Sequence, residues 1–303
     1  MKIGIIGATS NIAGKAYLPV YAHLQDQHDF VMYSRDLAKA EALKSRTHFS
    51  DAVSDLTALE SCEAVCIHAA TAEHFHLAKY FLTRGIPVLL DKPISENFSE
   101  TQELLTLGKK TLFMTAFNRR YAPQMQKLKE VPDKQVVRTV KNLAAHQGEP
   151  VFQLYDIFSH PLDTLLYLLD DLPEKLIHGE NWWYNIKLVE EKLQRVDVWV
   201  ETPTATGSAS MNLNAGAFQE EMTVEAPSGI YRLSDLTHFV KFDGNQKIIS
   251  DPNGWNSAPV NRGFDTIIMT FLDAVKSDKV LKQPYVLLTH QIISEILQKE
   301  GLT

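Results

Sequence analysis

The first 120 residues alternate between buried-strand patterns and amphipathic helical patterns, and this alternation limits the possible folds more than any other feature. Strand patterns cover residues 2–6, 30–33, 64–69, 87–90 and 112–117, and helical patterns cover 12–25, 55–59, 71–84 and 97–109. Strands separated by helices at this spacing form a parallel, doubly wound sheet. The sequence therefore predicts an α/β domain of Rossmann type over residues 1–120.

The pattern of predicted secondary structure changes after Tyr121, where short strand patterns follow one another with few helices between them. From Glu174 to Ser250 the chain is rich in strands, and short connections such as 202–204 and 227–229 favour antiparallel pairing. Helical patterns at 151–169, 263–276 and 285–299 complete this half. A chain of 303 residues is long for one core. We therefore expect a second, α+β domain over 121–303 with a large, mainly antiparallel sheet.

The composition excludes several classes of partner. The net charge of −7 argues against binding to nucleic acid or to a membrane surface. No apolar run approaches the roughly 20 residues of a membrane helix, and Met1 leads directly into a strand rather than a signal peptide. Two cysteines, Cys62 and Cys66, form no metal motif, so we expect no metal and a reduced, cytoplasmic protein.

A glycine-led turn follows the first strand at once and begins a helical pattern. Strand, turn and helix in this order form the phosphate cradle of dinucleotide-binding domains. The spacing here is one residue longer than in the usual glycine pattern, with Ser10 and Ala13 in place of the later glycines. The candidate cofactor-binding residues in this turn are Gly7, Thr9, Ser10, Asn11 and Ile12.

The end of the second strand indicates which dinucleotide is bound. Ser34 and Arg35 stand where an NAD site usually has an acid, and an arginine suits the 2′-phosphate of NADP. NADP is therefore favoured over NAD, with a solvated arginine at a helix start as the other reading. The next strand ends contribute the remaining cofactor candidates, which are His68, Ala69, Ala70, His74, Asp91 and Lys92.

The segment from Val88 to Ser95 ends an apolar strand abruptly in Asp91, Lys92 and Pro93. Ligands of open α/β sheets bind beyond the carboxyl ends of the strands, where this lysine would lie. A solvated lysine followed by a turn proline is the alternative interpretation.

Four segments together resemble the glucose–fructose oxidoreductase and inositol dehydrogenase family (Gfo/Idh/MocA). They are Gly7 to Val20, Val65 to His74, Asp91-Lys92-Pro93 and Ala116 to Tyr121. The Asp-Lys-Pro triplet matches the family's Glu-Lys-Pro with the shorter acid. Residues 91–97 and 117–123 look closest to the MviM-like branch, whose members are named as virulence-factor homologues.

The resemblance implies an Asp-x-x-x-His pair in the second domain that faces the nicotinamide, matched here by Asp156 and His160. His160 would take the proton, Asp156 would orient the imidazole or a substrate hydroxyl, and Lys92 would hydrogen-bond the reacting oxygen. Asn118 and Arg119 would bind substrate, although at least one of the two adjacent arginines is expected to be structural. Family members often form homodimers or homotetramers, and we expect the same here.

Two residues near His160 depart from the family pattern. Phe158 stands where glycine is common, and Pro161 directly follows the histidine. Proline inside a helix clashes with the carbonyl four residues earlier. Either the helix kinks here, or Ser159 caps a helix that starts late. In the second case the helix dipole would favour a neutral imidazole at His160.

Three functions remain open. The first is an NAD(P)-dependent oxidoreductase that acts on a sugar, cyclitol or related polyol-like small molecule. The second is a dinucleotide-binding sensor or interaction protein with little or no catalysis. The third is an extended short-chain reductase, but that group requires Tyr-x-x-x-Lys, and no tyrosine of this chain has a lysine four residues later.

Overall fold

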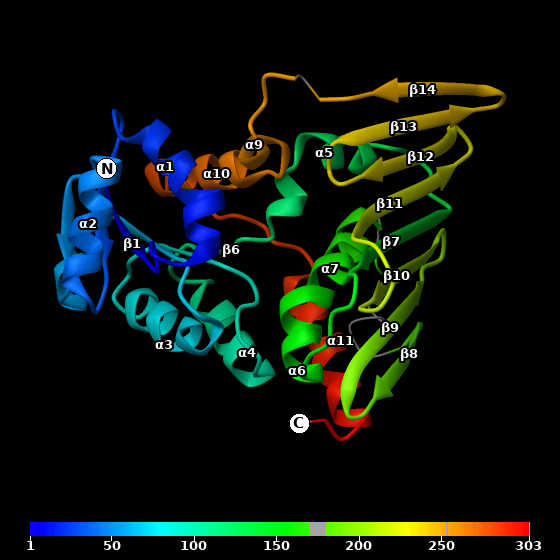
Figure 1. Ribbon diagram of the computed structural model, residues 1–303, viewed down its shortest axis with the longest axis horizontal. Helices are drawn as coiled ribbons and strands as arrows, with labels where there is room; N and C mark the ends of the chain where they lie inside the picture. The colour runs from blue at the N-terminus through cyan, green and yellow to red at the C-terminus, as the bar shows by residue number, and fades with distance from the viewer. Residues whose placement is uncertain (170–171, 173–179, 253, 303) are drawn as a thin grey trace. The chain divides into compact units, whose positions relative to one another are not determined.

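The computed structural model describes residues 1–169, 172, 180–252 and 254–302, and these form two compact units (Figure 1). Unit 1 contains residues 1–118 and 258–283, and unit 2 contains 119–257 and 284–303. The predicted division at residue 120 placed 258–283 in the second domain, whereas this segment packs with the first. The part of the predicted strand-rich stretch at 174–179 lies outside the described residues.

Unit 1 is built on a six-stranded, fully parallel sheet with the strand order β3-β2-β1-β4-β5-β6. The strands are β1 (Lys2–Ile6), β2 (Asp29–Tyr33), β3 (Asp51–Val53), β4 (Ala64–Ile67), β5 (Val88–Leu90) and β6 (Phe113–Thr115). The chain reverses its direction of progress between β1 and β4, which is where ligands bind in open α/β sheets. The predicted doubly wound sheet is confirmed, and β3 was missed because three residues show no period.

The helices of unit 1 connect these strands, except for α9 and α10, which follow β14 in the chain. They are η1 (Ala13–Tyr17), α1 (Leu18–Leu24), α2 (Leu37–Thr47), η2 (Leu56–Ser61), α3 (Thr71–Leu82), α4 (Phe98–Leu107), α9 (Ala258–Asn261) and α10 (Phe264–Ser277). The helical pattern predicted over 12–25 forms two parts, because the π-helical turn η1 ends at Tyr17 and α1 begins at Leu18 with Pro19 in its first turn. Figure 1 shows α3 and α4 on one side of the sheet and α1 and α10 on the other.

Unit 2 is built on an eight-stranded sheet with the order β14-β13-β12-β11-β7-β10-β9-β8. The strands are β7 (Val136–Asn142), β8 (Trp182–Val189), β9 (Lys192–Glu201), β10 (Thr206–Asn212), β11 (Gln219–Ala226), β12 (Gly229–Ser234), β13 (His238–Asp243) and β14 (Gln246–Ser250). The β7–β10 pair is parallel, and the other neighbouring pairs are antiparallel. The predicted mainly antiparallel sheet is confirmed.

Helices cover one face of this sheet (Figure 1). They are η3 (Asn118–Tyr121), α5 (Pro123–Lys129), α6 (Pro150–Phe152), η4 (Gln153–Phe158), α7 (Ser159–Leu168) and α11 (Val286–Lys299). Leu162, Leu165 and Leu166 of α7 are fully buried in this core. A Cβ at Gly207 would lie 2.6 Å from Leu165 Cδ1, so glycine in β10 lets α7 approach the sheet closely. Among the described residues, no helix has the length and apolarity needed to cross a membrane.

Candidate functional site

The turn after β1 depends on Gly7, whose backbone is left-handed with a φ of +79°. A Cβ at this position would lie 2.4 Å from the carbonyl carbon of His68. Glycine therefore lets the end of β1 pack directly against the end of β4. Ser10 donates its N–H to the Gly7 carbonyl (2.9 Å) and accepts the Ala13 N–H at Oγ (3.1 Å). The serine that replaces a glycine thus stabilises the turn that leads into η1.

A cavity of about 440 Å³, which we call the strand-end cavity, lies beyond the carboxyl ends of β1, β2 and β4. Seven predicted cofactor residues line it: Gly7, Thr9, Ser10, Ser34, Arg35, Ala69 and Ala70. Six other predicted cofactor residues are not part of its lining: Asn11, Ile12, His68, His74, Asp91 and Lys92. The prediction missed lining residues such as Lys39 and Glu73, which stand in the first turns of the helices that follow the predicted segments.

The carboxylate next to Arg35 is already engaged within α2. Asp36 caps this helix, since one carboxylate oxygen accepts the Lys39 N–H at 3.2 Å and the other lies 3.1 Å from Lys39 Nζ. These hydrogen bonds from Lys39 lower the pKa of Asp36. Arg35 is highly exposed, with Nη1 3.8 Å from Glu73 Oε1. The rim of the strand-end cavity therefore offers hydroxyl groups and two cations, a donor set that suits phosphate.

Beside the cavity, a network of buried polar side chains surrounds Asp91. Tyr17 donates its hydroxyl to Asp91 Oδ1 (3.1 Å), and the Lys92 N–H donates to the same oxygen (2.9 Å). His68 Nδ1 lies 3.9 Å from Asp91 Oδ2, and its Nε2 lies 2.8 Å from the Tyr21 hydroxyl. Burial alone would raise the pKa of Asp91, but His68 and Lys92 hold it below its ordinary value. Asp91 is therefore an ionised group beneath Lys92, and His68 is part of its packing.

In unit 2, the predicted Asp156 and His160 lie in one helical stretch that is partly π-helical and partly α-helical. The stretch runs from Pro150 to Leu168, and the π-helical η4, which contains the half-buried Asp156, precedes α7 directly. Ser159 is the first residue of α7 and does not cap it, so Pro161 lies in the first turn. The predicted position of Pro161 in the first turn of a helix is confirmed, whereas the predicted serine cap is wrong, because Ser159 lies within α7 and the π-helical η4 precedes it directly. Because η4 continues directly into α7, His160 does not lie at a free helix N-terminus. The predicted effect of a helix dipole on its imidazole therefore does not apply.

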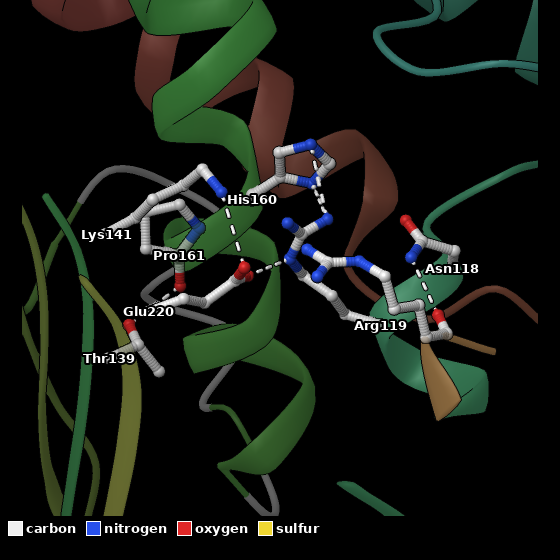
Figure 2. A network of polar contacts seen from close by, with 8 residues as sticks. Asn118, Arg119, Thr139, Lys141, His160, Pro161 and Glu220 are labelled. Carbon is white, nitrogen blue, oxygen red and sulfur yellow. Dashed lines mark hydrogen bonds and ion pairs between the residues drawn. The ribbon is translucent and has the colours of Figure 1, made fainter. Parts of the chain in front are cut away.

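The buried guanidinium of Arg119 contacts His160 instead (Figure 2). Its Nη1 lies 2.8 Å from His160 Nδ1 and 3.3 Å from Nε2, and its Nε donates to Glu220. Lys141 Nζ lies 3.4 Å from the other Glu220 oxygen. A guanidinium can only donate, so the imidazole nitrogen that it contacts carries a lone pair. The positive charge next to His160 is therefore the Arg119 guanidinium of η3 and not the N-terminus of a helix.

Arg120 is the structural arginine of the adjacent pair. Its guanidinium donates two parallel bonds to Asp163, at 2.8 and 2.6 Å, and a third to the Pro284 carbonyl at 2.8 Å. Thr289 donates to the same carboxylate at 3.3 Å. Burial would lower the pKa of Arg120, but Asp163 raises it. Asn118, predicted to bind substrate, donates its amide to the Arg262 carbonyl at 2.8 Å within unit 1.

Comparisons with known proteins indicate the family. Residues 1–119 match the model of an oxidoreductase family with an NAD-binding Rossmann fold, GFO_IDH_MocA. YceM of Salmonella typhimurium, an oxidoreductase by name, is 28% identical over 297 residues, which cover 92% of this chain and 91% of YceM. A Gfo/Idh/MocA family oxidoreductase from Vibrio cholerae has a crystal structure that is 28% identical, covers 99% of both chains and gives a TM-score of 0.89. Residues 1–119 thus match the Gfo/Idh/MocA family model, and the chain as a whole is similar to YceM and to a solved member of that family.

A further relative is similar to part of this chain. IolU of Bacillus subtilis, named as a scyllo-inositol 2-dehydrogenase (NADP(+)), is 28% identical over 135 residues, or 43% of this chain and 40% of IolU. A dehydrogenase named MviM from Clostridium difficile shares the fold, with a TM-score of 0.89 at 22% identity over 99% of both chains. The predicted resemblance to the family is therefore confirmed, and the likeness to MviM shows a shared fold.

The match of residues 1–119 to an NAD-binding oxidoreductase model supports an oxidoreductase with a nicotinamide cofactor and a small-molecule substrate. The strand-end cavity fits such a cofactor, since the Gly7 turn, the Ser10 and Ser34 hydroxyls and the Arg35 guanidinium all border it. In the part of the chain that the structure describes, no three His, Cys, Asp or Glu side chains gather as metal ligands.

Proposed function

We propose that the protein is an NADP-dependent dehydrogenase that oxidises or reduces a CH–OH group of a sugar, cyclitol or related polyol-like substrate. The observation that carries this proposal is the strand-end cavity, with Arg35 at its rim and Asp36 committed to capping α2. An arginine at this position binds the 2′-phosphate of NADP, and an available acid would instead bind the ribose hydroxyls of NAD. The name of IolU supports both the cofactor and the substrate class.

In this proposal the nicotinamide, when bound, accepts or donates the hydride. Lys92 hydrogen-bonds the reacting oxygen and stabilises the negative charge that develops on it. His160 receives the proton that an alcohol releases on oxidation, which requires the substrate hydroxyl to replace the Arg119 N–H at the lone pair of His160 Nδ1. Asp156 orients the imidazole or a substrate hydroxyl. Asn118 and Arg119 complete the proposed substrate-binding set.

The first test concerns the cofactor. Arg35→Ala removes a charge-assisted contact to phosphate, which contributes roughly 1.5–3 kcal/mol. We expect the Kd for NADPH to rise about 10- to 100-fold and the Kd for NADH to change less than about threefold. Arg46→Ala is the matched control, because Arg46 is an exposed arginine of α2 that does not line the strand-end cavity. Equal weakening of both cofactors by Arg35→Ala would contradict the assignment.

The second test concerns catalysis. A panel of sugars and cyclitols is offered to the purified protein with NADP⁺, and reduction is followed at the nicotinamide absorbance band. Turnover of at least one compound is expected. Cofactor binding without turnover across the panel would favour the sensor or interaction protein instead. A homodimer or homotetramer and a cytoplasmic location stay predictions, which analytical ultracentrifugation and cell fractionation would test.

A further inference from the structure

His74 makes two contacts that the cofactor site does not use. It is the fourth residue of α3 and is 1% exposed. Its Nδ1 lies 2.7 Å from the Pro93 carbonyl oxygen, and its Nε2 lies 3.1 Å from the Ala69 carbonyl oxygen. Both ring nitrogens thus face backbone, which leaves the predicted cofactor-binding role of His74 without a ring atom to perform it.

The two carbonyls belong to two different strand-end segments. Ala69 follows β4 and lines the strand-end cavity, and Pro93 follows β5 and is joined directly to Lys92. β4 and β5 are neighbours in the sheet, with Ile67 paired to Leu90. One side chain therefore bridges the segment that borders the cofactor cavity and the segment that carries the lysine.

The protonation state of the ring decides which of the two carbonyls receives a hydrogen bond from His74. A carbonyl only accepts, so a neutral imidazole can donate to one of the two oxygens and an imidazolium can donate to both. Burial lowers the pKa of His74, although the bonds to Pro93 and Ala69 and the charge of Asp91 oppose this effect. The neutral ring keeps the shorter contact, so its N–H is assigned to the Pro93 carbonyl.

The segment around Lys92 is thus fixed on both sides. The Lys92 N–H is held by Asp91 Oδ1 at 2.9 Å, and the carbonyl of the next residue is held by His74 at 2.7 Å. We propose that His74 is a positioning residue, which sets where Lys92 stands relative to the strand-end cavity by tying the Pro93 backbone to α3. The proposal rests on the proposed role of Lys92 in catalysis.

Two variants separate positioning from packing. His74→Phe keeps the ring volume and removes the N–H that donates to the Pro93 carbonyl, and His74→Gln restores a donor. A misplacement of about 1 Å can cost roughly 10²-fold in rate, so we expect kcat to fall by about that factor in His74→Phe and to recover largely in His74→Gln. The Kd for NADPH is expected to stay within about threefold of the wild-type value. His76→Phe is the matched control, since His76 is an exposed histidine two residues further along α3.

Amide hydrogen exchange gives a readout that does not need turnover. In His74→Phe we expect faster exchange in the amides of residues 92–98, with α3 and α4 protected as in the wild type. Unchanged kcat, or faster exchange throughout α3, would overturn the proposal and leave a packing role. A Kd for NADPH that rises as much as kcat falls would make His74 part of the cofactor site instead. If the wild type neither binds NADPH nor turns over, the proposed function fails, and exchange still tests the bridge.

Discussion

The two units of this protein bury charge in different ways. In unit 1 a single carboxylate, Asp91, is surrounded by a tyrosine hydroxyl, a backbone amide and a histidine. In unit 2 two buried arginines each face a carboxylate, Arg119 with Glu220 and Arg120 with Asp163. Loss of one member of a buried ion pair leaves an uncompensated charge, whereas loss of a neutral donor costs less. We therefore expect substitutions at the strand ends of unit 1 mainly to reduce activity. Substitution of Arg120, which leaves Asp163 buried without its partner, should mainly reduce the free energy of unfolding.

The largest effect is expected at Lys92. Lys92→Met removes the group proposed to stabilise charge on the reacting oxygen, and we expect kcat to fall by about 10³-fold or more. The Kd for NADPH should change little, because Lys92 does not line the strand-end cavity, and the melting temperature should fall modestly, because Lys92 no longer compensates the charge of the buried Asp91. Steady-state kinetics and thermal melting check this, with Lys79→Met on α3 as the control. Turnover within about tenfold of the wild type would remove Lys92 from the mechanism.

The next effect is expected at Arg120 and appears in stability. Arg120→Met leaves Asp163 buried without its bidentate partner, which should lower the free energy of unfolding by about 3–5 kcal/mol. Urea unfolding measures the change. The double variant Arg120→Met/Asp163→Leu should recover part of it, since no unpaired charge remains. Arg138→Met, which breaks the exposed pair with Glu225, should cost far less. Equal costs for the two single variants would refute the contrast.

A smaller effect concerns His290, a buried histidine of α11 whose Nδ1–H donates to the Val286 carbonyl, 2.9 Å away. Burial lowers its pKa to about 4. Between about pH 6.5 and pH 4 the unfolded chain therefore binds a proton that the folded chain does not, so stability falls as the pH falls. From pH 7 to pH 5 this group should account for a loss of about 2 kcal/mol.

Unfolding titrations at the two pH values, compared with His290→Gln, check the contribution of His290. The variant should lose less stability on acidification than the wild type does. The same loss in both proteins would show that another group titrates in this range.

The strand ends of unit 1 could be predicted from the sequence because topology decides their positions. Parallel strands place their carboxyl ends at one edge, so Gly7, Ser34 and Ala69 had to meet once the alternation was recognised. The contact of Arg119 with His160 could not be predicted in this way. It depends on η3, on the π-helical η4 and on Glu220, which is 101 residues from Arg119. No local pattern marks such a contact.

Two further failures have the same origin. The helix α10 reads as part of the second domain because it follows the strand-rich stretch, yet it packs in unit 1. The sequence placed His74 near a strand end, where its ring could bind a cofactor. Only the structure shows that its two ring nitrogens face the Pro93 and Ala69 carbonyls.

The most direct test of the central claim is a calorimetric titration of the purified full-length chain with NADPH and with NADH. If the strand-end cavity holds NADP, NADPH should bind at one site per chain, with a Kd at least about tenfold below that for NADH, a preference of roughly 1.4 kcal/mol. Tighter binding of NADH, or no heat of binding from either cofactor, would contradict it.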